Sequence, residues 1–275
     1  MSGRSTWTTF WRTVCGRAYP RVIGAQRERS WVFFEILLPL LQVTAYVFIY
    51  RAIQAPPEFL GFVVLGGAMS AYWLNVLWSM ASQLYWEKET GNLELYIVAP
   101  TSRMAILLGM ALGGMFQTTL RAVAIITIGS LLFRVPMTVT NVPVLLGVFL
   151  TTLVALYGLG MMLSSLFLLF GREAWHFSNL LQEPVSLVSG FYFPVRALGQ
   201  VIAAAASALP ITLGLDAMRQ LLFPSMMENL RFLSADVELG ILAGSAVLFL
   251  VLAHRALAHF EKLARREGRL TVRGQ

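Results

Sequence analysis

Few side chains in this sequence could carry out a reaction. Its two lysines, Lys88 and Lys262, stand outside any G-x-x-x-x-G-K-[ST] run, the pattern that binds nucleotide phosphates. The three histidines, His176, His254 and His259, lack the spacing of zinc ligands, and the single cysteine adds no ligand set. No G-x-S-x-G nucleophile elbow is present either. We therefore expect no catalytic site, no metal site and no cofactor held by this chain.

Two charged side chains are of functional interest because they interrupt apolar runs. Arg121 lies in the second half of the run 104–133, and Glu183 lies near the middle of the run 177–193. Ionisable residues at membrane depth usually face a protein interior or a water-filled cavity, so they are functional candidates. They would suit a proton-coupled secondary transporter or an intramembrane lipid-modifying enzyme. Alternatively, they pair with one another, or Arg121 extends to the membrane interface.

A third group of charges lies in residues 86–103, a polar segment between two long apolar runs. Glu87, Lys88, Glu89 and Glu94 crowd into it. In a membrane protein such a segment lies in water, where a partner can bind it. Alternatively, it is an ordinary solvated loop whose acids keep it hydrated.

The backbone of this polar segment has the residues of a bent elbow. Gly91 breaks the chain, Asn92 is a suitable N-cap, and Glu94 in the first turn favours the helix dipole. Residues 93–98 can then form a short helix, and Pro100 pushes the residue before it out of helical geometry. We predict an elbow that moves as one unit when it is pushed.

The composition predicts the class of protein to which these charged side chains belong. The chain has 275 residues, of which 57% are hydrophobic and 13% are charged, and its mean hydropathy is +0.69. A soluble domain carries about 25% charged residues. The formal charge of +7 comes mainly from bases near the two ends, which fits a cytoplasmic membrane surface better than a nucleic-acid-binding face. We expect an all-α polytopic membrane protein that forms a single domain over residues 1–275.

Six apolar runs are long enough, or nearly so, to cross a bilayer core about 30 Å thick as helices. They are residues 31–50, 59–84, 104–133, 142–170, 177–193 and 239–257. With six spans, most of the 21 lysines and arginines lie on the side of both termini. A seventh span through 201–215 would place the basic C-terminal tail on the opposite side. We therefore predict that 201–215, broken by Pro210, is an outer re-entrant or surface segment.

The two ends of the chain are predicted to be cytoplasmic. Residues 1–30 would form an interfacial helix and a basic segment, because Trp7 and Trp11 share an apolar face over 7–19 that Pro20 ends. A disordered basic tail is the alternative. Residues 31–260 would hold the six spans, and 261–275 would be a basic tail. Arginines throughout the first thirty residues argue against a cleaved signal peptide.

Gly109 and Gly113 form a G-x-x-x-G pattern within the third run. This spacing lets two helices approach closely. The partner helix could belong to the same subunit or to another one.

Two sequence motifs together resemble a known family. Glu87 to Glu94 (EKETGNLE), followed by Pro100, Arg103 and Gly109, resembles the cytoplasmic loop of ABC-2 type transporter permeases. Residues 189–194 (SGFYFP), followed by Leu198, Pro210 and residues 216–219 (DAMR), resemble the outer re-entrant segment of the same family. The sequence departs from the family pattern where Asn92 replaces Thr, Tyr96 replaces Leu and Met110 replaces Lys.

The resemblance implies a transport subunit that is not itself an enzyme. Such permeases have six spans, form homodimers or heterodimers, and bind cytoplasmic ATPase subunits that hold ATP and Mg. The residues that would meet the ATPase are Glu87, Glu89, Gly91, Asn92 and Glu94. Gly190, Phe191 and Pro194 would shape an outer gate. The implied substrate is a lipid-linked glycan, a glycolipid or a hydrophobic drug, exported across a bacterial inner membrane.

Overall fold

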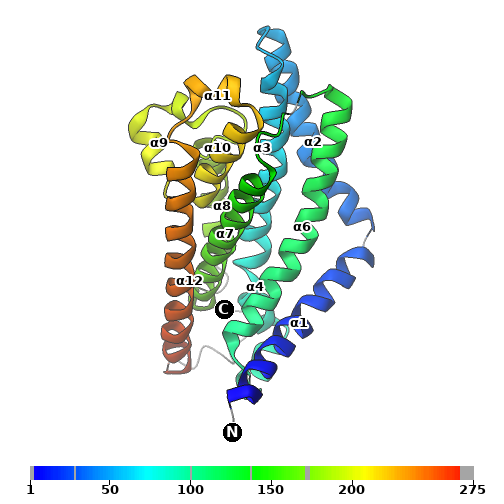
Figure 1. Cartoon of the computed structure of the whole chain (residues 1–275). Coiled ribbons are helices and arrows are strands. Elements are labelled where there is room, and N and C mark those ends of the chain that lie inside the picture. The colour runs from blue at the N-terminus through cyan, green and yellow to red at the C-terminus, as the bar shows by residue number, and fades with distance from the viewer. Residues whose placement is uncertain (1–2, 28, 100, 137, 171–173, 267–275) are drawn as a thin grey trace.

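The computed structural model describes residues 3–27, 29–99, 101–136, 138–170 and 174–266, which form helices and no strand (Figure 1). The long helices are α1 (Gly3–Arg27), α2 (Arg29–Ala52), α3 (Glu58–Leu74), α6 (Arg103–Phe133), α7 (Val142–Phe170) and α12 (Ala235–Arg266). The shorter ones are the π-helical η1 (Asn75–Met80), α4 (Gln83–Glu89), α5 (Asn92–Val98), α8 (Ala174–Val188), η3 (Val195–Leu198), α9 (Gln200–Ala206), α10 (Pro210–Leu222) and α11 (Pro224–Leu230). The all-α prediction is confirmed.

Five helical segments in the described part of the chain are long and apolar enough to cross a membrane. They are Val32–Ala52, Glu58–Glu89, Arg103–Phe133, Val142–Phe167 and Ala235–His259. They match the first four and the last of the expected runs. The chain is therefore a multi-pass membrane protein. The last nine residues of the expected basic tail, 267–275, lie outside the described residues.

The expected fifth span, 177–193, is shorter than predicted. Its helix, α8, has 15 residues and is therefore about 22 Å long, less than the bilayer core of about 30 Å. The helix ends at Val188 because Gly190 adopts a left-handed conformation with φ of 70°, and the chain turns. After that turn, α9 and α10 are long and apolar enough to cross a membrane only when they are taken together, and the pair is bent by 109°. Thus 201–215 forms no straight span, and Pro210 opens the second limb of the bend.

The core is built around α3. Its residues are apolar on all sides, which is typical of a helix enclosed by others. It packs against α2, α6 and α10, while α12 packs along α7. Figure 1 shows α9, α10 and α11 at one end of the bundle, and α4 with the start of α1 at the other. The span formed by α3, η1 and α4 connects these two ends.

The N-terminal helix extends further than its sequence predicts. The predicted stop at Pro20 is wrong, because α1 continues through it to Arg27. A proline inside a helix removes one backbone hydrogen bond, but α1 packs along α6 over this stretch. A Cβ atom on Gly113 of α6 would lie 2.9 Å from Cβ of Arg21, and one on Gly109 would lie 2.8 Å from Cβ of Arg17. The G-x-x-x-G pattern therefore serves a close contact within one chain.

Candidate functional site

The elbow after the second span has a glycine turn. α4 ends at Glu89, Gly91 follows with φ of 80°, and α5 begins at Asn92. α5 ends at Val98, and Ala99 is extended, with φ of −63° and ψ of 136°. The predicted break at Gly91 and the predicted short helix are confirmed; Pro100 lies outside the described residues.

One detail of the elbow prediction is wrong. The N-cap of α5 is Gly91, and Asn92 is the first helical residue. The side-chain amide of Asn92 instead donates to Oγ1 of Thr90 at 3.1 Å. A left-handed residue is needed between α4 and α5, and glycine adopts that conformation without a Cβ penalty.

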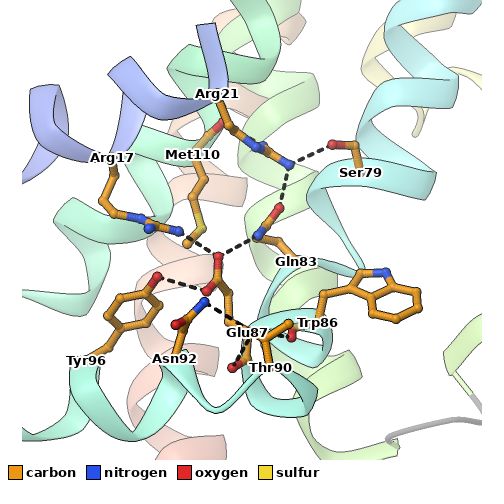
Figure 2. A network of polar contacts seen from close by, with 10 residues as sticks. All are labelled: Arg17, Arg21, Ser79, Gln83, Trp86, Glu87, Thr90, Asn92, Tyr96 and Met110. Carbon is orange, nitrogen blue, oxygen red and sulfur yellow. Dashed lines mark hydrogen bonds and ion pairs between the residues drawn. The ribbon is translucent and has the colours of Figure 1, made fainter. Parts of the chain in front are cut away.

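Glu87 is the central residue of the elbow, and it is only 6% exposed. Its Oε1 accepts hydrogen bonds from Nη2 of Arg17 at 2.6 Å and from Nε2 of Gln83 at 2.8 Å. Its Oε2 accepts from the hydroxyl of Tyr96 at 2.8 Å. Figure 2 shows the side chains of Arg17, Gln83 and Tyr96 converging on this carboxylate. A single buried carboxylate thus joins α1, α4 and α5.

Tyr96 is held as a hydrogen-bond donor in this arrangement. Burial, and after it the hydrogen bond to Glu87, raises the pKa of the Tyr96 hydroxyl well above its ordinary value. The hydroxyl therefore stays protonated at neutral pH. The guanidinium of Arg17 also lies over the Tyr96 ring, 4.9 Å from its centroid, where a cation is attracted to the aromatic face.

Arg21 extends the network toward the membrane core. Its Nη1 donates to the carbonyl oxygen of Met110 at 2.8 Å, and its Nη2 donates to Oγ of Ser79 at 2.7 Å. Nη2 also donates to Oε1 of Gln83, whose Nε2 donates to Glu87. Both ends of the Gln83 amide are therefore used, which fixes its orientation. Burial lowers the pKa of the Arg21 guanidinium below its ordinary value, so the acceptors bound to this cation stabilise its charged form.

The residues predicted to meet an ATPase are divided between two faces of the elbow. Asn92 and Glu94 are exposed, whereas Glu89 is partly buried and Gly91 forms the turn. The Glu87 carboxylate faces inward and accepts hydrogen bonds from three side chains of the same chain, and its predicted contact with an ATPase stays a prediction. Sequence alone did not reveal this, since Arg17 is 70 positions away from Glu87.

The residues of the predicted outer gate belong to the turn between α8 and η3, which leads into α9 at the end of the bundle opposite the elbow (Figure 1). Gly190, Phe191 and Pro194 are all buried there. A Cβ atom on Gly66 of α3 would collide with the carbonyl oxygen of Phe191, so α3 and the 189–194 turn are in direct backbone contact. Tyr50 of α2 donates to the carbonyl oxygen of Tyr192 at 2.7 Å.

Arg219 of α10 holds this turn, a role that the sequence analysis missed. The side chain is buried. Nη1 donates to the carbonyl oxygen of Gly190 at 2.6 Å, and Nη2 donates to those of Phe191 at 2.6 Å and Phe62 at 3.0 Å. The guanidinium lies 3.2 Å from the centroid of the Phe62 ring. The available signal in the sequence was an arginine three residues after Asp216 in a mainly apolar segment.

The two intramembrane charges do not form one site. Arg121 forms an ion pair with Glu35 of α2, so the hypothesis that Arg121 pairs with Glu183 is wrong. Glu183 is exposed on α8, where its Oε1 accepts a hydrogen bond from Gln182 at 3.2 Å. Glu35 lies near the start of the apolar run 31–50, so the sequence offered it as a second acidic partner for Arg121. Among the described residues, no group of three or more His, Cys, Asp or Glu side chains could hold a metal ion.

Comparison with known proteins assigns the chain to a family. A search of curated proteins found no match. The family model described as ABC-2 type transporter matches residues 22–223, more than half of the chain. The match includes both the elbow with Glu87 and the outer turn held by Arg219. The chain therefore belongs to the ABC-2 type transporter family and is a membrane-spanning permease subunit of an ABC transporter.

Proposed function

We propose that this permease works in an ATP-driven exporter and that its α4–α5 elbow receives the movement of a separate ATPase subunit. The observation that carries the proposal is the buried Glu87 carboxylate bonded to α1, α4 and α5. Hydrogen bonds to a charged acceptor are stronger than neutral ones. A force on α5 would therefore also move α4 and α1.

The outward face of α5 supports docking of a protein partner. Leu95 is 68% exposed and Val98 is 85% exposed, and they share this short helix with the exposed Asn92 and Glu94. Apolar side chains next to polar ones are typical of the centre and rim of protein interfaces. In the proposal, Asn92 and Glu94 contact the ATPase, Glu87 positions the elbow, and the partner binds ATP and Mg.

The second span would carry the movement across the membrane. The outer turn packs against Gly66, in the first third of the span Glu58–Glu89, and Glu87 of the elbow lies near the end of that span. Between them lies the π-helical segment η1, where Ser79 binds Arg21 and Asn75 accepts from Tyr157 at 2.8 Å. π-helical turns inside α-helices occur often at functional sites. In this proposal, Gly190, Phe191 and Pro194 form the outer gate.

The proposed substrate is a lipid-linked glycan, a glycolipid or a hydrophobic drug, as in ABC-2 permeases in general. The proposed location is the bacterial inner membrane, with both termini and the elbow in the cytoplasm. The concentration of lysines and arginines near the termini supports that orientation. A second permease, either a copy of this chain or a relative, would complete the pathway.

A coupling variant tests the proposal. The chain is purified from its natural host with its partner, reconstituted in liposomes, and assayed for ATP hydrolysis and substrate export. Glu94→Arg reverses the charge on the proposed docking face, so we expect ATP hydrolysis to persist while export is lost. The control is Glu228→Arg, which changes an exposed glutamate on α11 at the far end of the bundle. Full export by liposomes that lack any ATPase would overturn the proposal.

An intramembrane enzyme built on Arg121 and Glu183 has no structural support. Arg121 is paired with Glu35, while Glu183 lies exposed on another helix. If Glu183 alone acted as a proton carrier, export would stop when the proton gradient is removed and would continue after ATP is depleted.

A further inference from the structure

A cavity of about 290 Å³ lies inside the subunit, between α3, α6, α7 and α10. Its inner wall comes from α3 and α10, with buried residues such as Ala68, Met69 and Met218. Its outer wall comes from α6 and α7. The cavity is separate from the elbow, and none of the predicted site residues lines it.

The lining of the cavity excludes polar ligands. Among the described residues that line it, Tyr72 and Thr119 alone have polar side chains. The Tyr72 hydroxyl donates to Oγ1 of Thr119 at 2.8 Å, and that hydroxyl donates to the carbonyl oxygen of Met115 at 2.8 Å. Both donors are thus used within the protein. A polar ligand would lose its hydrogen bonds to water and gain few, which is costly, and apolar cavities of this kind do not retain water.

The cavity opens between α6 and α7. Val123 of α6 is 56% exposed and Leu146 of α7 is 53% exposed, whereas the lining residues on α3 and α10 are buried. The surface around this mouth is apolar, and includes the exposed Leu120 of α6 and Leu150 of α7. Both helices belong to candidate spans, so the mouth faces membrane lipid. The molecules that meet it there are hydrocarbon chains.

We propose that this cavity binds one acyl chain of a membrane lipid. A void in a packed interior loses the dispersion contacts of the atoms that line it, and a flexible chain from the adjacent bilayer restores them. The size is compatible with a single slender chain, because about 290 Å³ lies at the lower limit of the about 300–1,000 Å³ of pockets for drug-sized ligands. The mouth lies where α6 approaches its end and α7 begins, in the half of the membrane farther from the elbow (Figure 1). The bound lipid would therefore come from that leaflet.

Photolabelling tests this inference in the intact protein. The chain is reconstituted with a phospholipid that carries a diazirine in its acyl chain, irradiated, and digested for mass spectrometry. We expect labels on the inner wall, at Met69 or Met218. Val123→Trp places a large side chain at the mouth without overfilling the core, so the labels on the inner wall should be lost.

The control is Leu132→Trp, an equally large change at an exposed position of the same helix that does not line the cavity. It should leave the inner-wall labels intact. Two results would overturn the inference: an inner wall that stays unlabelled in the unaltered protein while the outer faces of α6 and α7 are labelled, or inner-wall labels that persist in Val123→Trp. Neither result depends on an ATPase, so the test is independent of the proposed coupling function.

Discussion

The elbow lies at the end of the span Glu58–Glu89, the outer turn packs against the first third of that span, and the two are held by different means. At the elbow, Arg17 bonds to the side chain of Glu87, and the Arg17 side chain is 28% exposed. At the outer turn, the buried Arg219 donates to three backbone carbonyls, and Gly66 brings the backbone of α3 against that of Phe191. Side-chain networks near water can exchange partners, whereas close backbone packing cannot shift without steric conflict. This contrast predicts an elbow whose side-chain contacts can rearrange and an outer turn that moves only as one rigid unit.

The largest effect is expected from Arg219→Met. It removes the donors of three carbonyl groups, and each unsatisfied group costs about 1 kcal/mol or more. We expect the free energy of unfolding to fall by about 3 kcal/mol, measured by thermal or denaturant unfolding in detergent. Arg196→Met is the control, because Arg196 bonds the exposed carbonyl of Asn229, and should change stability by less than about 0.5 kcal/mol. Equal losses for the two variants would show that Arg219 stabilises the outer turn no more than an exposed arginine does.

Gly66→Ala is expected to have the next largest effect. The new Cβ atom would meet the carbonyl oxygen of Phe191, which is backbone and cannot rotate away. Overpacking of this kind costs about 1–3 kcal/mol. The matched control is Gly147→Ala in α7, where a Cβ atom meets nothing within 4 Å, and stability should stay the same or rise by up to about 1 kcal/mol. A stable Gly66→Ala protein would show that the outer turn is looser than its contacts indicate.

At the elbow, Gly91→Ala should have a smaller effect. An alanine in the left-handed conformation of Gly91, with φ of 80°, costs about 1–2 kcal/mol. Gly91→Asn should be tolerated better, because asparagine adopts this conformation more readily. Limited proteolysis of the elbow, together with thermal unfolding, measures both variants. Gly240→Ala, at an open helical position of α12, is the control. Equal behaviour of the alanine and asparagine variants would contradict the backbone explanation.

The smallest effect on stability is expected from the Arg17–Glu87 pair. A double-mutant cycle with Arg17→Gln and Glu87→Gln should give a coupling energy of about 0.5–1 kcal/mol, because Arg17 is partly exposed to water. The same variants should reduce export per ATP hydrolysed more than they reduce stability. A coupling energy of zero would mean that α1 and α4 do not share this contact in the membrane.

Backbone chemistry explains which local predictions were confirmed. Gly91 breaks the chain, and Ala99 before Pro100 is extended, because glycine and proline restrict the backbone wherever they stand. The prediction that Pro20 ends the first helix was wrong. Pro20 loses one hydrogen bond, but the contact of α1 with α6 outweighs that loss, and the sequence does not encode that contact locally.

The partners of charged residues could not be predicted in the same way. Arg121 pairs with Glu35, and Glu87 pairs with Arg17, each across many residues of intervening chain. The sequence shows that such charges need partners at membrane depth or in a buried elbow. It does not show which partner lies nearby, because that depends on how the helices pack.

The sequence by itself determined the membrane class, the approximate spans and the family motifs of this permease, because hydropathy and backbone restrictions act locally. The tertiary structure decided the direction in which Glu87 faces, the clamp formed by Arg219, the pairing of Arg121 with Glu35 and the cavity that opens between α6 and α7. All four depend on residues far apart in the chain that meet only when α3 is enclosed by its neighbours. Long-range contacts of this kind arise from packing of the whole helical bundle, so no single segment specifies them.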